Sequence, residues 1–149
     1  MVKKIFANNK KAYHDYEILE KLEVGLVLSG HEVKAIKCSN VSLLDSLVKF
    51  SSQEAFVENM FIAPYEQIST HILDYNAKKK RKLLMHKQEI KRMYSKVKEK
   101  GLTVIPLEVY VGSKGKIKLL IGLAKGKKSY DKKELLKQKD IARQMAREY

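Results

Sequence analysis

The sequence contains few of the residues that mark secreted, fibrous or membrane proteins. It has one cysteine, two prolines and seven glycines in 149 residues. Cys38 alone cannot form an internal disulfide, which suits a reducing cytosol, and the scarcity of proline and glycine excludes a collagen-like or linker-dominated chain. The longest apolar runs, such as residues 24–28, are far too short to cross a bilayer, and residues 1–11 lack the apolar run of a leader. We therefore expect a soluble, cytoplasmic protein with one domain and a tail.

Groups of residues typical of enzymes are also absent. The four histidines do not stand at zinc-ligand spacing from one another or from Cys38. Residues 122–129 resemble a phosphate-binding loop, but three residues separate the glycines where the motif needs four, and Lys128 separates Lys127 from Ser129. Carboxylates do not cluster as in metal-dependent nucleases. We therefore expect no enzymatic activity, no metal and no cofactor.

The second half of the chain carries the net positive charge. Residues 1–75 contain 8 Lys+Arg and 10 Asp+Glu, whereas residues 76–149 contain 23 and 7, so the net charges are −2 and +16. Such asymmetry is typical of a protein that binds a polyanion, most often a nucleic acid. A lysine-rich surface kept for solubility is the alternative. An anionic membrane fits less well, because no lipidation signal or basic amphipathic helix with bulky aromatics accompanies the charge.

Three basic clusters stand out, and aromatic residues adjoin two of them. The clusters lie at residues 10–11, 78–82 and 126–128. The five adjacent cations at residues 78–82 repel one another, so such a run is favoured where phosphates or solvent ions neutralise its charge. A flat side chain beside cations suits base stacking next to phosphate contacts, worth about 1–3 kcal/mol per base. Tyr130, in a polar segment, is the better stacking candidate, whereas we assign Tyr13 to the core.

Hydrophobic periodicity predicts a mainly β domain with short helices. Residues 13–72 are mostly strand-like, with apolar residues alternating on both sides of a turn at residues 51–53. Residues 31–37 read as a short helix with Val33 and Ile36 inward. The basic residues before this region are expected to form a mobile lead-in, residues 1–11.

The clearest helix is predicted at residues 87–100, ended by Gly101. Its apolar residues fall at i, i+3, i+4 and i+7 and form one inward stripe: Ile90, Met93, Tyr94 and Val97. Two β-rich runs, at 103–111 and 116–124, follow around a hairpin turn, and Pro106 indicates an edge strand or a bulge. Short strands with two or three small helices favour an α+β domain, and we predict a small closed antiparallel β-barrel, in which an exposed sheet face can present a groove to RNA.

The last residues of the chain show a periodic pattern that fits a helix. If residues 131–149 were helical, one flank would gather Leu135, Ala142, Met145, Ala146 and Tyr149. Another flank would gather Lys132, Lys139, Arg143 and Arg147. Such a charged helix is marginal in water on its own, but phosphates would neutralise it. We therefore expect residues 129–149 to be a tail that is disordered when free and folds to a helix on RNA.

Several motifs, in one order along the chain, resemble the SsrA-binding protein family (small protein B). The motifs are NKKAYHDY (residues 9–16), EVGL (23–26), GHEVK (30–34), STH (69–71), RKLLMH (81–86) and GLAKGKK (122–128). The likeness covers nearly the whole chain, and linked motifs in register are far more specific than any one of them. The resemblance implies an oligonucleotide-binding-type barrel with about three flanking helices over residues 1–128.

The resemblance also implies a function and its partners. The partner would be transfer-messenger RNA, whose tRNA-like half the barrel grips, and the complex would enter stalled ribosomes, at the decoding centre and the mRNA channel of the small subunit. Elongation factor Tu and alanyl-tRNA synthetase would act on the same RNA, and the chain would work as a monomer. The barrel would stand in for the missing anticodon arm, while the tail probes the empty channel.

The family motifs further imply which residues bind. Lysines and arginines would contact phosphates, Glu23 would accept hydrogen bonds from base edges or 2′-hydroxyls, and Leu84 would pack under an exposed base. The implied RNA-binding residues are Asn9, Lys10, Lys11, His14, Glu23, Lys34, Arg81, Lys82, Leu84, Lys118, Lys125, Lys127 and Lys128. The implied ribosome-binding residues of the tail are Tyr130, Asp131, Lys132, Lys133, Lys139, Arg143, Met145 and Arg147.

Two other functions stay open from the sequence. Another ribosomal or tRNA-binding module would bind RNA without needing residues 130–149. A nuclease or RNA-modifying enzyme would need the acidic or nucleophilic clusters that this sequence lacks.

Overall fold

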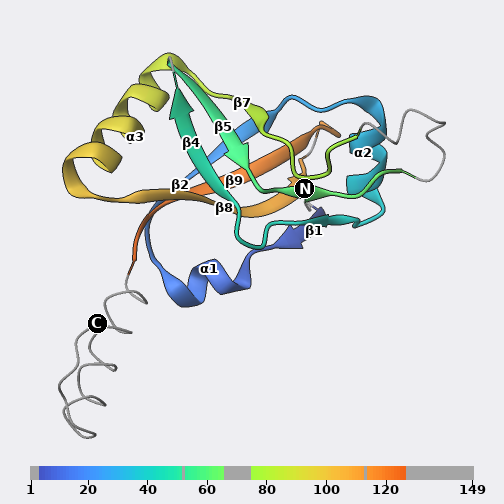
Figure 1. The fold of residues 1–149 in the computed structure, drawn as a ribbon, viewed down its shortest axis with the longest axis horizontal. Helices are drawn as coiled ribbons and strands as arrows, with labels where there is room; N and C mark the ends of the chain where they lie inside the picture. Colours follow the sequence, from blue (N-terminus) through green and yellow to red (C-terminus); the bar gives the residue numbers. More distant parts are fainter. Residues whose placement is uncertain (1–3, 52, 66–74, 113, 127–149) are drawn as a thin grey trace, which may run out of the picture.

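The computed structural model describes residues 4–51, 53–65, 75–112 and 114–126, and Figure 1 traces the chain. The strands of that part of the chain are β1 (Lys4–Asn8), β2 (Glu17–Leu26), β3 (Val41–Ser42), β4 (Leu47–Ser51), β5 (Glu54–Glu58), β6 (Phe61–Ile62), β7 (Arg81–Leu84), β8 (Thr103–Val111) and β9 (Ile117–Lys125). The helices are α1 (Lys10–Asp15), α2 (Gly30–Lys37) and α3 (Lys87–Lys100). Figure 1 shows α3 at the left end of the strands, α2 at the right end and α1 below them.

Antiparallel pairing closes the described strands into a barrel. The strand order is β8-β4-β5-β7-β2-β9, and β9 pairs back with β8 to close the ring, while β1 adds to the outside of β8. Strands β3 and β6 form a separate two-stranded sheet. Closure leaves none of the six barrel strands with an open edge, which is the usual reason for a small domain to adopt this form. The predicted closed antiparallel barrel with flanking helices is therefore confirmed.

The core explains why β8 and β9 are almost continuously apolar. One face of each strand packs inside the barrel, where Val104, Val109 and Leu119 are buried. The opposite face of β8 packs under α1, where Leu107 lies against Ala12 in a second cluster. A strand that is buried on both faces loses the simple alternation of apolar and polar residues.

The bulge predicted at Pro106 is present, but β8 is not an edge strand. The register of β8 against β9 shifts between Pro106 and Glu108. Proline has no N–H to donate to a ladder, so a bulge is where a central strand tolerates it. Strand β8 pairs with β9 on one side and with β1 and β4 on the other.

The predicted helices are confirmed, with one correction. In α2, Ile36 is fully buried and Val33 packs half-buried against the core. Helix α3 spans the predicted residues and ends at Gly101, whose φ of 65° is the left-handed conformation that glycine adopts freely. Ile90 and Met93 of its stripe are buried and Val97 is half-buried, but Tyr94 is 46% exposed. The stripe is therefore narrower than the periodicity predicts.

The prediction of a mobile lead-in over residues 1–11 is wrong for residues 4–11. Strand β1 pairs with β8, from Lys4 opposite Val111 to Asn8 opposite Glu108. Helix α1 follows at once, so Tyr13 is helical and does not begin a strand. The lysines of this segment led to the prediction of an unstructured lead-in, but Phe6 is buried in the core and holds β1 against the barrel.

Two predictions lie outside the described residues. The helical tail at 129–149, and with it the boundary between barrel and tail, falls beyond residue 126. In the described part of the chain, no helix combines the length and the apolar character needed to cross a membrane.

Candidate nucleic-acid interface

Strand register brings three of the predicted site residues together on the outside of the barrel. Gly25 of β2 lies opposite Leu84 of β7 on one side and opposite Lys118 of β9 on the other. Residues directly opposite each other point to the same face of a sheet, and Glu23, two residues before Gly25, points to that face as well. Glu23 and Leu84 are exposed, and Lys118 is half-buried. We call this outer face, defined by Glu23, Leu84 and Lys118, the β2 face.

Gly25 makes room for Leu84 at the centre of the β2 face. A Cβ atom at Gly25 would lie 3.2 Å from Cβ and 3.3 Å from Cδ1 of Leu84. The leucine therefore leans over the glycine while 56% of it stays exposed. Gly25 belongs to the motif EVGL but is not among the residues expected to bind, although a glycine inside a strand often marks a close approach of this kind.

Tyr110 holds Glu23 in place. The Tyr110 hydroxyl donates a hydrogen bond to Oε2 of Glu23, and Tyr110 lies opposite Lys118 in the β8–β9 pair. Burial, together with the hydrogen bond to Glu23, raises the pKa of Tyr110 well above its usual value, so the phenol stays protonated and remains a donor. Sequence reasoning missed Tyr110, because only the strand register places it beside the β2 face.

Lys82 extends the β2 face along β7. It points outward two residues before Leu84, and its Nζ lies 2.9 Å from Oε2 of Glu54. Phe56 lies opposite Lys82, and Nζ of Lys80 sits 4.6 Å from the Phe56 ring centroid. An exposed ion pair is worth about 0–1 kcal/mol, so a phosphate can take the place of the Glu54 carboxylate at small cost.

Arg81 has a different role from the predicted one. Its side chain is 1% exposed and points inward, where Nη2 lies 2.8 Å from Oε2 of Glu32 and Nη1 donates to the Met60 carbonyl at 2.7 Å. Nη2 also donates to the hydroxyl of Tyr75 at 3.0 Å. Nε donates to Oε2 of Glu32 at 2.8 Å, so every nitrogen of the guanidinium is used inside the protein, and direct contact with RNA does not fit this placement. Arg81 instead fastens the start of β7 to α2.

Glu32 stays ionised at the centre of this network. Burial opposes its charge, but hydrogen bonds from the Ser29 N–H and Arg81, with the charges of Arg81 and Lys79, hold the pKa of the carboxyl below its usual value. Burial raises the pKa of Tyr75 to about 12, so its hydroxyl also remains protonated.

The predicted residues of α1 divide in the same way between interior and surface. Asn9 is buried: its Oδ1 accepts from the Ala12 N–H at 3.2 Å, capping the helix, and its Nδ2 donates to the Pro106 carbonyl at 2.8 Å. The other three lie on the surface: Lys10, Lys11 and His14. Lys11 lies 3.6 Å from Asp45.

Helix α1 is not part of the β2 face. It precedes the start of β2 at Glu17, whereas Glu23 lies six residues along the strand, which corresponds to about 20 Å. Two other predicted residues also lie away from the β2 face. Lys34 is on α2, with its Nζ 5.7 Å from the Tyr65 ring centroid, and Lys125 ends β9 opposite Glu17. The remaining predicted residues lie outside the described part of the chain: Lys127, Lys128, Tyr130, Asp131, Lys132, Lys133, Lys139, Arg143, Met145 and Arg147.

The described side chains do not assemble a metal centre. Among residues 4–51, 53–65, 75–112 and 114–126, histidine, cysteine, aspartate and glutamate form no group of three or more that could hold an ion. The β2 face itself combines the cations of Lys82 and Lys118 with the Glu23 carboxylate, which Tyr110 holds, and with the exposed Leu84.

Comparison with known proteins gives a consistent result. The sequence profile of a family described as SmpB protein matches residues 6–149. The SsrA-binding protein of Persephonella marina is 49% identical over 146 residues, which cover 98% of this chain and 94% of that protein. The SsrA-binding protein of Carboxydothermus hydrogenoformans is 50% identical over 145 residues, 97% of this chain and 95% of that one. A chain from the solved structure "tmRNA-SmpB: a journey to the center of the bacterial ribosome" superposes with a TM-score of 0.64 at 43% identity, covering 88% of this chain and 87% of that chain.

Proposed function

This chain belongs to the SmpB protein family, and from that membership we propose that it binds transfer-messenger RNA (SsrA RNA) and serves in the rescue of stalled ribosomes. The relatives named above are SsrA-binding proteins, and the superposed structure is one of tmRNA and SmpB at the bacterial ribosome. The charge of the chain, +14, suits such a partner.

The observation that carries the proposal is the β2 face. Lys118 and Lys82 supply cations for phosphates, and Glu23, fixed by Tyr110, presents a carboxylate to base edges or 2′-hydroxyls. Leu84 provides an exposed apolar surface for a base that is not stacked in a helix. These groups match a folded RNA with single-stranded loops better than a uniform duplex.

The mechanism we propose is mimicry followed by probing. The barrel stands where an anticodon arm would stand, and residues 129–149 enter the empty mRNA channel near the decoding centre and fold there. A full-length messenger occupies that channel, so the protein selects ribosomes that lack one. The chain makes and breaks no bond, acts as a monomer in the cytoplasm where ribosomes work, and reaches elongation factor Tu and alanyl-tRNA synthetase only through the RNA.

Recovery of bound RNA from cells tests this function. The full chain is captured from growing cells and the RNA that comes with it is sequenced. The proposal predicts that SsrA RNA is enriched far above its share of total RNA. Recovery of ribosomal RNA or tRNA without SsrA RNA would instead indicate another kind of ribosomal or tRNA-binding module.

A further inference from the structure

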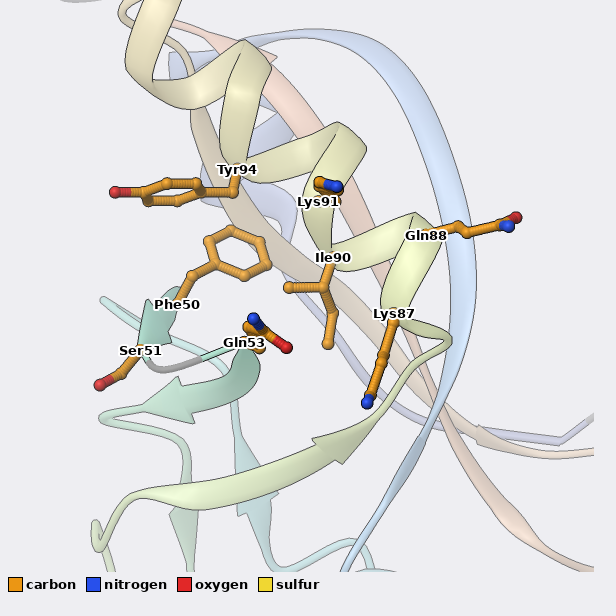
Figure 2. A pocket seen from close by; sticks show the side chains of 8 residues that line it. All are labelled: Phe50, Ser51, Gln53, Lys87, Gln88, Ile90, Lys91 and Tyr94. Atoms are coloured by element: carbon orange, nitrogen blue, oxygen red, sulfur yellow. The ribbon is translucent and has the colours of Figure 1, made fainter.

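A cavity of about 430 Å³ opens between the β4–β5 turn and α3, at one end of the barrel. Phe50 and Ser51 line it from the end of β4, Gln53 from the turn, and Ile90 and Tyr94 from α3 (Figure 2). Its volume falls within the range of about 300–1,000 Å³ that is usual for small-ligand sites. It is separate from the side chains that define the β2 face.

Two aromatic rings form the wall of this cavity. Phe50 and Tyr94 meet edge to face, with ring centroids 6.2 Å apart and an angle of 66° between the rings. Figure 2 shows the Phe50 ring beneath Tyr94, with Ile90 beside it. Phe50 is half-buried against the core, whereas Tyr94 is 46% exposed, although helical periodicity places it on the inward stripe. An aromatic ring that the protein leaves uncovered offers a face on which a flat ligand can stack.

The charge around the cavity favours an anionic ligand. Lys87 and Lys91 line it one helical turn apart, and none of the described lining residues is acidic. A base attached to phosphates matches both features, since its ring stacks on an aromatic side chain while the phosphates meet ammonium groups. An apolar peptide would match only the rings.

The cavity lies a short distance along the chain from the β2 face. Leu84 ends β7, and Lys87 begins α3 three residues later, which is at most about 10 Å of chain. An RNA strand that leaves Leu84 toward α3 is therefore within reach of Lys87, which lines the cavity.

We propose that this cavity receives one unstacked base of the RNA bound on the β2 face. The base stacks on Tyr94 beside Phe50, and Lys87 and Lys91 contact the phosphates that flank it. Gln53 supplies an amide that can both donate to and accept from the edge of the base. This inference rests on the proposed function and adds to it a second point of contact, at the far end of the RNA-binding surface.

The experiment combines ultraviolet cross-linking with equilibrium binding, using the full-length chain and SsrA RNA. Cross-linked peptides from wild type are expected to include Tyr94 or the β4–β5 turn. Tyr94→Leu keeps an apolar side chain but removes the ring, so this cross-link should be lost and the affinity should fall roughly 5- to 150-fold, the range for one stacked base. Circular dichroism of Tyr94→Leu establishes that the barrel is intact.

A matched pair of lysine substitutions tests the phosphate contact. Lys91→Gln should lower the log–log slope of affinity against salt by roughly 0.7–0.9, as expected for one lost phosphate contact. Lys100→Gln removes the same charge from the last turn of α3, away from the cavity, and should leave the slope unchanged. If Tyr94→Leu does not fold, the difference in slope between Lys91→Gln and Lys100→Gln tests whether the RNA reaches the cavity.

Three results separate the possible failures. In the first, wild type binds RNA tightly but gives no cross-link at the cavity, and Tyr94→Leu and Lys91→Gln behave as wild type. This result overturns the base site and leaves the proposed function standing. A cross-link from Tyr94 to a ribosomal protein, in ribosome complexes, also overturns it. Absence of RNA binding by wild type contradicts the proposed function itself.

Discussion

At the scale of single residues, strand register creates the β2 face. Glu23, Leu84 and Lys118 are more than thirty positions apart from one another in the sequence, and they meet because Gly25 lies between β7 and β9. No local pattern in the sequence fixes which residues of distant strands pair. For this reason the contact between Gly25 and Leu84, and the place of Tyr110 beside Glu23, could not be predicted from the sequence.

Filling the space above Gly25 tests the geometry of the β2 face. Gly25→Val puts a branched side chain where Leu84 now leans, so Leu84 must move and the affinity for SsrA RNA should fall about tenfold, which corresponds to about 1.4 kcal/mol. The barrel should still fold, because valine suits a strand. Gly30→Val is the control, since a Cβ there meets no atom within 4 Å. Equal affinities for the two variants, measured by equilibrium binding, would contradict this geometry.

The adjacent residues Arg81 and Lys82 should behave in opposite ways. Arg81→Met leaves the buried Glu32 carboxylate without its partner and should cost about 3–5 kcal/mol of unfolding free energy. Lys82→Met removes an exposed cation, so it should change stability by less than about 1 kcal/mol and weaken RNA binding mainly at low salt. Urea unfolding and salt titration measure the two effects. If Lys82→Met lowered the unfolding free energy as much as Arg81→Met does, the placement of Arg81 in the interior and of Lys82 on the surface would be wrong.

The buried pair also predicts a dependence of stability on pH. The pKa of Glu32 is lower in the folded chain than in the unfolded one, so its contribution is complete above the unfolded pKa and disappears as pH falls through the folded value. Wild type should therefore lose unfolding free energy between about pH 5 and about pH 3. Glu32→Gln should be less stable at neutral pH, with a gap that narrows on acidification. A constant gap across that range would contradict the role given to the carboxylate.

At the scale of elements, prediction succeeded where the determinants are local. Helix α3 has its apolar stripe, its terminal Gly101 and its charged surface within one segment, and its bounds follow from them. Strand β1 is not recognised from the sequence because it is short and lies among lysines, and because pairing with the distant β8 and burial of Phe6 define it. Tyr94 is the opposite case. The helical periodicity of α3 places its side chain inward, but the end of the barrel does not extend far enough to cover the ring.

Removing the tail separates RNA binding from ribosome rescue. Deletion of residues 129–149 leaves the barrel and its β2 face intact, so the affinity for SsrA RNA should stay largely unchanged. Tagging of nascent chains on stalled ribosomes should be lost, because the proposed probe of the mRNA channel is gone. The comparison uses RNA binding and a tagging assay on the same preparation. Normal tagging by the shortened chain would favour a different RNA-binding module.

At the scale of the whole molecule, the chain joins a closed barrel to a large excess of positive charge. The barrel orients Glu23, Leu84 and Lys118, while a net charge of +16 over residues 76–149 draws a polyanion toward it. Composition alone predicts the class of partner, and the motifs narrow it to one RNA. The path of that RNA over the protein depends on the strand register and on the shape of the end of the barrel. Composition encodes neither of them.

The most direct test of the account is the affinity of the full chain for the tRNA-like part of SsrA RNA across a range of salt concentrations. Each neutralised phosphate should contribute roughly 0.7–0.9 to the slope of log affinity against log salt. We predict tight binding at modest ionic strength, a slope of several units, and a shallower slope for Lys82→Met. Failure to bind this RNA at modest ionic strength, or an affinity that does not change with salt, would contradict the claim that the basic barrel exists to hold a folded RNA.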